Sequence, residues 1–246
     1  MDEEIKEKVF QQMMSLWVEP EINKRKSLDR LPKDFNLRAA QVIFSLDRGW
    51  NKVRLNDEVK AEAKVKLNAS KNKGDPIYEQ EIEHIESIKL TNEDPNCAHL
   101  TLLRIKDKWI LSFDFTYNQK RIKEHIEAAK EFLDSAKDNL VKNRLRPFFE
   151  NSFACSELLA KSILLQLPNK KILYGTNHDE RINEFKNWAV LGNVEIKHSA
   201  LLERLNSLRP SARYLCSTEF KEEDILKIIK NLEELMQFAE RIVNSK

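Results

Sequence analysis

Leu208-Arg209-Pro210-Ser211-Ala212-Arg213-Tyr214-Leu215 lies between two long amphipathic helical patterns near the C-terminus. Proline removes a backbone donor and disturbs a helix interior, so the pattern predicts a helix that ends at Leu208 and a bend after it. Arginine is rarely buried, and two arginines four residues apart beside a tyrosine form a concentrated polar cluster. This cluster is therefore either a solvated corner of a helical domain or a binding site.

Helical periodicity extends over the whole C-terminal half. Apolar residues recur at spacings of three and four at about 121–140 and 147–167, and again at about 177–192 and 196–208. Glu222-Glu223-Asp224 favours the N-terminus of a last helix, because acidic side chains stabilise that end. The apolar stripe of this last helix is broader than one partner helix requires, and a second copy of the chain is one way to cover it.

The N-terminal half has a different period. A helix is expected at about residues 1–16, followed by an irregular stretch between Trp17 and Pro32. Apolar and polar residues then alternate at 59–67 and 109–117, as in half-buried antiparallel strands. Turn signals separate further strands at about 37–46, 98–106 and 82–91, the last with a bulge. The sequence thus predicts an α+β chain in which a helix and a five-strand antiparallel β-meander (1–118) precede a helical domain (119–246).

Composition excludes several classes of function. Lys+Arg 42 against Asp+Glu 40 leaves a net charge of +2, so nucleic-acid binding would need a local basic patch. The chain has only 4 glycines and no glycine-rich phosphate loop, and its 3 widely spaced cysteines and 5 scattered histidines nominate no disulfide framework or metal site. We expect no cofactor. A polar N-terminus and the lack of a long apolar run predict a cytoplasmic protein without a membrane partner.

Four features in order resemble one family. A long helix ends near Leu140, and Ala154-Cys155-Ser156-Glu157-Leu158-Leu159-Ala160-Lys161 is similar to an alanine-rich helix with a glutamate and a lysine four apart. Leu205-Asn206-Ser207-Leu208-Arg209 with Ala212-Arg213-Tyr214 is similar to an arginine motif, and Phe220 leads into the long last helix. On these features residues 121–243 resemble the HEPN family (higher eukaryotes and prokaryotes nucleotide-binding domain). The N-terminal half resembles no family that we can name.

The resemblance implies an up-and-down helical bundle that commonly forms a homodimer and, in active members, a metal-independent ribonuclease. Those members carry an arginine, then a polar residue, and a histidine four to six positions after the arginine. Arg209 matches the arginine, but Pro210 follows it and no histidine stands at the later positions. RNA cleavage needs a base and an acid near neutral pH, a role that suits imidazole and that neither tyrosine nor arginine fills easily. The resemblance therefore supports the fold and a polar site, whereas the missing histidine favours a protein that is not an enzyme.

The candidate site residues are Arg209, Arg213 and Tyr214, joined on the resemblance by Glu157 and Lys161. A corner where the arginines pair with acidic neighbours is one reading of Arg209, Arg213 and Tyr214, and an anionic ligand held by two guanidinium groups and a stacking phenol is another. Arg209 and Tyr214 are also the candidates for a catalytic role. An ion pair within one helix is the expected role of Glu157 and Lys161.

Other polar and aromatic residues are expected to be structural. We expect His178 and His198 to lie at the surface or to cap a helix. The aromatic side chains of Phe113 and Phe115 favour a place in the core over a base-stacking platform.

Three hypotheses of function remain open. The first is a dimeric protein that binds RNA or a nucleotide-like anion without cleaving it, with bacterial defence as its setting. The second is a divergent HEPN ribonuclease that acts as the toxin of a toxin–antitoxin pair. The third is a scaffold in which the helical domain dimerises and the β domain binds a partner protein.

Overall fold

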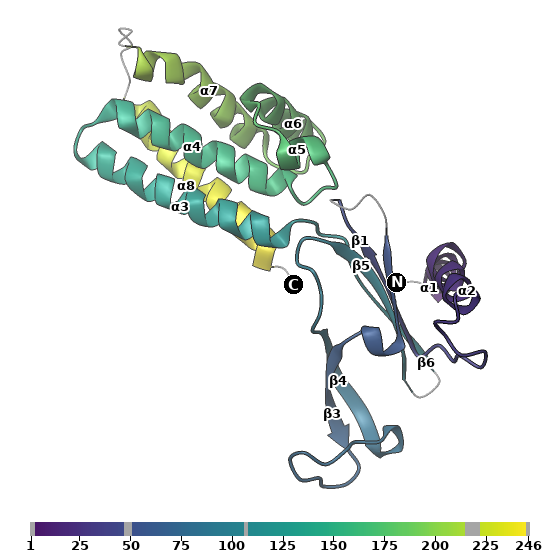
Figure 1. The fold of residues 1–246 in the computed structure, drawn as a ribbon. Coiled ribbons are helices and arrows are strands. Elements are labelled where there is room, and N and C mark those ends of the chain that lie inside the picture. The colour runs from purple at the N-terminus through teal and green to yellow at the C-terminus, as the bar shows by residue number, and fades with distance from the viewer. Residues whose placement is uncertain (1–2, 47–50, 106–107, 215–221, 245–246) are drawn as a thin grey trace. The chain divides into compact units, whose positions relative to one another are not determined.

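The computed structural model describes residues 3–46, 51–105, 108–214 and 222–244, and it divides the chain into two compact units, Met1–Thr116 and Tyr117–Lys246 (Figure 1). The first unit combines helices with antiparallel strands, and the second is helical. The predicted α+β class, with an antiparallel β part followed by a helical bundle, is confirmed.

The N-terminal helix is longer than the sequence pattern predicted. Helix α1 (Glu3–Met13) continues through one π-helical turn (Met14–Val18) into α2 (Glu19–Ser27). The predicted irregular stretch after Trp17 is therefore wrong as far as Ser27. Pro20 lies in the first turn of α2, directly after the π-helical turn, and it does not end the helical segment.

The strands form two sheets. Strands β1 (Ala39–Phe44), β2 (Lys52–Leu55), β5 (Ala98–Ile105) and β6 (Lys108–Asp114) pair in the order β2-β1-β5-β6, whereas β3 (Ala61–Leu67) pairs with β4 (Ile82–Leu90) in a separate ribbon. The predicted single five-strand meander is therefore wrong. With four residues, β2 is too short to show a period of two, and it takes the place beside β1 that the meander gave to β3. The predicted bulge in β4 is confirmed by shifts in its pairing with β3.

Helices α1 and α2 cover one face of the four-stranded sheet (Figure 1). The core between them is formed by buried residues of both layers: Met13, Val18, Ala40, Val42, Leu55, Leu100 and Leu102. Trp109 and Leu111 of β6 pack against this core. Phe113 and Phe115, farther along the chain, are 49% and 53% exposed, so the expectation that they belong to the core is wrong. The alternating pattern correctly predicted a strand here, but it did not show that α1 and α2 cover only the first part of β6.

The second unit contains α3 (Gln119–Val141), α4 (Leu145–Leu164), α5 (Lys170–Tyr174), α6 (His178–Val190), α7 (Ile196–Arg213) and α8 (Glu222–Asn244). Helix α4 is central and packs against α3, α6, α7 and α8 (Figure 1). Its buried side is rich in large apolar side chains, which the surrounding helices cover: Phe148, Phe149, Phe153, Leu159 and Ile163. Among the described residues, no helix is both long and apolar enough to cross a membrane.

Two helix ends decide where the polar side chains of this unit lie. Asn177 caps α6 by accepting a hydrogen bond from the backbone N–H of Asp179 at 3.0 Å, which sets His178 as the first helical residue. Helix α7 was predicted to end at Leu208, but it continues through Pro210 to Arg213. Only one turn follows the proline, so its missing N–H removes a bond near the frayed end of the helix, and the Pro210 carbonyl still accepts from the Tyr214 N–H at 2.8 Å.

Candidate functional site

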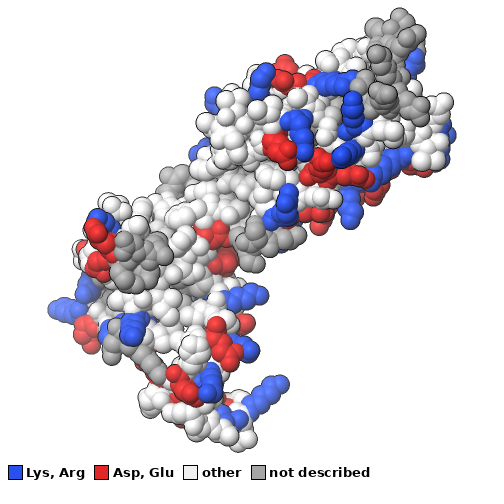
Figure 2. All heavy atoms as spheres, turned by 180° about the vertical axis from the view of Figure 1, so that it is seen from behind, with Lys and Arg blue, Asp and Glu red and all other residues white. Residues whose placement is uncertain are grey.

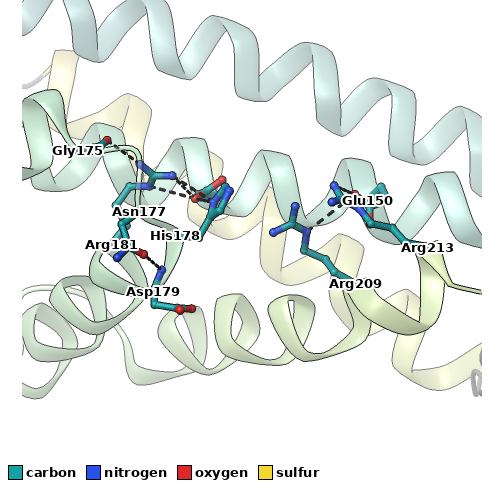
Figure 3. Close-up of polar contacts among 9 residues, drawn as sticks. Glu150, Gly175, Asn177, His178, Asp179, Arg181, Arg209 and Arg213 are labelled. Atoms are coloured by element: carbon teal, nitrogen blue, oxygen red, sulfur yellow. Dashed lines mark hydrogen bonds and ion pairs between the residues drawn. The ribbon is translucent and has the colours of Figure 1, made fainter.

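A polar stripe runs along the side of α4 that α6 and α7 frame. Glu150, Phe153, Glu157 and Lys161 are spaced by three or four residues, so they share one face of this helix. Figure 3 shows the side chains of Arg209 and Arg213 pointing from α7 toward α4, while His178 and Arg181 approach the same helix from α6. We call this the α4 face.

Glu150 fixes the arginine pair at one end of the α4 face. Arg213 donates from Nε and Nη2 to the two carboxylate oxygens, both at 2.8 Å. The hydrogen bonds and the charge of Glu150 raise the pKa of Arg213 above its ordinary value. The Nε of Arg209 lies 3.9 Å from the same carboxylate. The charge of Arg213 is therefore compensated within the bundle, as the corner reading expects.

Arg209 is held in a different way. Its guanidinium carbon lies 4.1 Å from the centre of the Phe153 ring, and the side chain is only 17% exposed. This is a cation–π contact, which holds a flat guanidinium group against the ring. The Nε of Arg209 is buried and has no hydrogen-bond partner. Buried donors without an acceptor are uncommon, so this nitrogen is an exception within the bundle.

Glu157 joins α4 to α6. Its Oε1 accepts from Arg181 Nη2 at 2.6 Å and from Arg181 Nε at 3.0 Å, while Arg181 Nη1 donates to the Gly175 carbonyl at 3.0 Å. The two side chains are only 13% and 9% exposed. The predicted ion pair between Glu157 and Lys161 is wrong, because the nearby buried guanidinium competes successfully for the carboxylate.

His178 completes this cluster. Its Nδ1 lies against Oε1 of Glu157, and its ring meets Phe153 edge-on with 5.9 Å between ring centres. The same Nδ1 lies 3.2 Å from Arg181 Nη2, so the imidazole is held between the carboxylate of Glu157 and the guanidinium of Arg181. Because Arg209 and His178 both touch the Phe153 ring, the structure brings a histidine beside the arginine motif from another helix (Figure 3).

The other expected site residues lie at the margins. Lys161 stands one turn beyond Glu157 on α4 and is half-buried. Tyr214 follows the end of α7 and is 73% exposed, so the bundle does not enclose its phenol. His198 is 2% exposed within α7, which contradicts its expected surface or capping place.

The sequence did not nominate several residues of the α4 face. Glu150, Phe153, His178 and Arg181 were missed because their contacts join different helices. One available signal was the spacing of three residues between His178 and Arg181, just after a capping asparagine.

The charges on one side of the molecule do not form one large basic surface. On the side of the molecule that Figure 2 shows, lysine and arginine side chains are interspersed with aspartate and glutamate. Within the described ranges, no group of three or more His, Cys, Asp or Glu side chains is placed to hold a metal ion. An anionic ligand would therefore be recognised by a few positioned groups.

Comparison with known proteins identifies the helical half. Residues 122–242 match the family model described as HEPN domain, which confirms the resemblance drawn from the arginine motif and the alanine-rich helix. The N-terminal half has no family assignment. The search of curated proteins gave no match.

Proposed function

Since residues 122–242 are a HEPN domain, we propose that the C-terminal unit binds an RNA or a nucleotide-like anion on the α4 face. The observation that carries this proposal is Arg209, whose guanidinium lies on the Phe153 ring with its buried Nε unpaired. A planar guanidinium suits phosphate recognition because several N–H groups point from one rigid plane.

The proposal gives unequal roles to the two arginines. Both oxygens of Glu150 accept from Arg213, so a phosphate would have to compete with that carboxylate for Arg213. Arg209 lies farther from Glu150 and has the donor without an acceptor. We therefore assign ligand contact first to Arg209, and a supporting role to Arg213 and the exposed Tyr214.

A homodimer through the helical unit is part of this proposal. HEPN domains commonly dimerise. Helix α8 supports a dimer here because Leu226 is 62% exposed while the neighbouring Ile225 and Ile228 are buried, so its apolar stripe extends beyond the bundle. A place in bacterial defence rests on the family alone, and the identity of the neighbouring genes tests it.

Binding to a labelled single-stranded RNA octanucleotide, measured by fluorescence anisotropy, tests the main proposal. Arg209→Ala is expected to weaken binding about tenfold or more, the size of one charge-assisted hydrogen bond. Arg204→Ala, an exposed arginine on the same helix, is the control and should leave the affinity within about twofold. Equal affinities of the two variants, or no binding by the unaltered chain to the RNA or to ATP, would refute the proposal.

A second candidate function is ribonuclease activity, and the pairing of His178 with Glu157 is the observation that favours it. Cleavage requires a proton to leave the 2′-hydroxyl as it attacks phosphorus and a proton to reach the departing 5′-oxygen. One imidazole can serve first as base and then, once protonated, as acid. Cleavage of RNA in EDTA that is lost in His178→Ala but kept in His84→Ala, an exposed histidine of β4, would establish this activity. Cleavage that survives His178→Ala would exclude this role for the dyad.

A further inference from the structure

We propose that Lys161 of α4 and Arg121 of α3 form a second phosphate subsite beside the Glu157–Arg181 ion pair, so that the ligand of the α4 face is a short single-stranded oligonucleotide. This inference rests on the proposed function, because Arg209 supplies the first contact with the ligand. It narrows the ligand of the α4 face from RNA or a nucleotide-like anion to a single-stranded oligonucleotide.

The geometry of the subsite comes from three helices. Arg181 is anchored from α6 to Glu157, and Lys161 stands one turn beyond Glu157 on α4. Arg121 lies in the first turn of α3, which packs against α4, and donates to Asn118 Oδ1 at 3.3 Å. Within the part of the chain that the structure describes, Lys161 makes no hydrogen bond or ion pair, although its side chain is half-buried. An ammonium group is thus held among packed helices without an acceptor.

Positive charge exceeds negative charge at this corner. Glu157, the carboxylate one turn before Lys161 on α4, already accepts from Arg181 and His178. Burial lowers the pKa of Lys161 below its ordinary value, and the neighbouring charges of Arg181 and Arg121 add to the effect, while Glu157 opposes it. The pKa of His125 is lowered in the same way, by burial and by the charges of Lys161 and Arg181. An arriving phosphate would relieve this repulsion.

The distance along α4 selects the length of the ligand. Lys161 follows Phe153 by eight residues, which corresponds to about 12 Å along the helix axis at about 1.5 Å per residue. Bases stacked as in one strand of a duplex advance about 3.4 Å each, so the two subsites are about three to four nucleotides apart. A mononucleotide can engage one subsite only. Glu157 does not block the path between them, since Arg181 neutralises it.

The test compares labelled tetrauridylate with labelled UMP over a range of salt concentrations, using the full chain. Lys161→Met keeps the length and apolar stem of the side chain and removes its charge. It is expected to weaken tetrauridylate binding about tenfold and to reduce the slope of log affinity against log salt by about 0.7, the value for one phosphate contact of a single strand. UMP binding should be unchanged, and Lys142→Met, which removes an exposed lysine paired with Asp138, should alter neither ligand.

The outcomes separate this inference from the proposed function. If Lys161→Met binds tetrauridylate with the affinity and salt slope of the unaltered chain while Arg209→Ala binds it weakly, the second subsite is refuted and the proposed function stands. If Arg209→Ala also binds normally, both are refuted. A loss in Lys161→Met that is matched by Lys142→Met would show a general charge effect and would also overturn the subsite. Circular dichroism of each variant establishes that the bundle is folded.

Discussion

Replacement of Glu157 by leucine should strongly destabilise the helical unit. The change leaves the volume of the side chain similar but removes the carboxylate from Arg181, whose side chain is only 9% exposed. Leaving one member of a buried ion pair uncompensated costs about 3–5 kcal/mol. For a unit of about 130 residues, with an unfolding entropy of about 2.1 cal/mol/K per residue, this loss lowers Tm by about 11–18 °C. Differential scanning calorimetry of the full chain measures the transition of this unit.

The matched control is Glu203→Leu. Glu203 pairs with Lys186 at 2.7 Å, but the two side chains are 39% and 54% exposed, so the loss should be below about 1 kcal/mol and Tm should fall by less than about 4 °C. Combining Glu157→Leu with Arg181→Met should recover much of the stability, because no buried charge is then left alone. If Glu157→Leu shifted Tm no more than Glu203→Leu does, the ion pair would not tie α6 to α4, and the placement of His178 argued above would fail.

Two further predictions concern buried titratable groups. Burial lowers the pKa of His198, and that of His125, so the unfolded chain binds protons that the folded chain resists, and the free energy of unfolding should fall as the pH drops from about 7 to about 5. Urea unfolding at several pH values measures this slope; His198→Leu combined with His125→Leu should flatten it, and an unchanged slope would contradict the assignment. Burial raises the pKa of Cys155 to about 12, so mass spectrometry should find this thiol unmodified by iodoacetamide at pH 8 in the folded protein and modified in urea, whereas modification in the folded protein would show that α4 is not packed as described.

The periodicity of apolar residues correctly predicted helices and strands that bury one face along their whole length. It gave the wrong burial where a strand is covered over only part of its length. The stripe at 121–140 corresponds closely to α3, whose buried residues recur at spacings of three and four. In β6 the same kind of pattern runs from Trp109 to beyond Phe113, yet α1 and α2 cover only its beginning. The alternation of β3 was likewise read as half-buried, but most of this strand is exposed because its only neighbour in a sheet is β4.

Prolines misled the prediction in one consistent direction. Pro210 was taken as the end of a helix and Pro20 fell in a stretch expected to be irregular, yet both lie inside helical segments. Pro210 sits within about one turn of the C-terminus of α7, and Pro20 follows the π-helical turn that joins α1 to α2. A proline near a helix end or beside a π-helical turn is therefore compatible with a continuous helical segment.

The candidate site was predictable in part because one of its helices carries a linear motif. Arg209 and Arg213 lie on one side of α7, so sequence spacing was enough to group them. Their partners on α4 and α6 are separated from them by long stretches of chain, and no pattern within one helix indicates that Glu150 meets Arg213 or that Phe153 meets Arg209. The pairing is set by helix packing, which a single sequence reports only through its apolar faces.

The departure of this chain from the ribonuclease motif has to be judged in space rather than along the sequence. Pro210 replaces the polar residue after Arg209, but it lies on the exposed side of α7, whereas Arg209 faces α4. The missing histidine is the more consequential change, because binding needs only the guanidinium and cleavage needs a proton carrier. His178, held by Glu157 against the same phenylalanine as Arg209, is the candidate for such a carrier under the proposed ribonuclease activity. Affinity should therefore depend on Arg209 whether or not RNA is cleaved, and only turnover can depend on His178, so measuring both quantities in both variants distinguishes a binding domain from a nuclease.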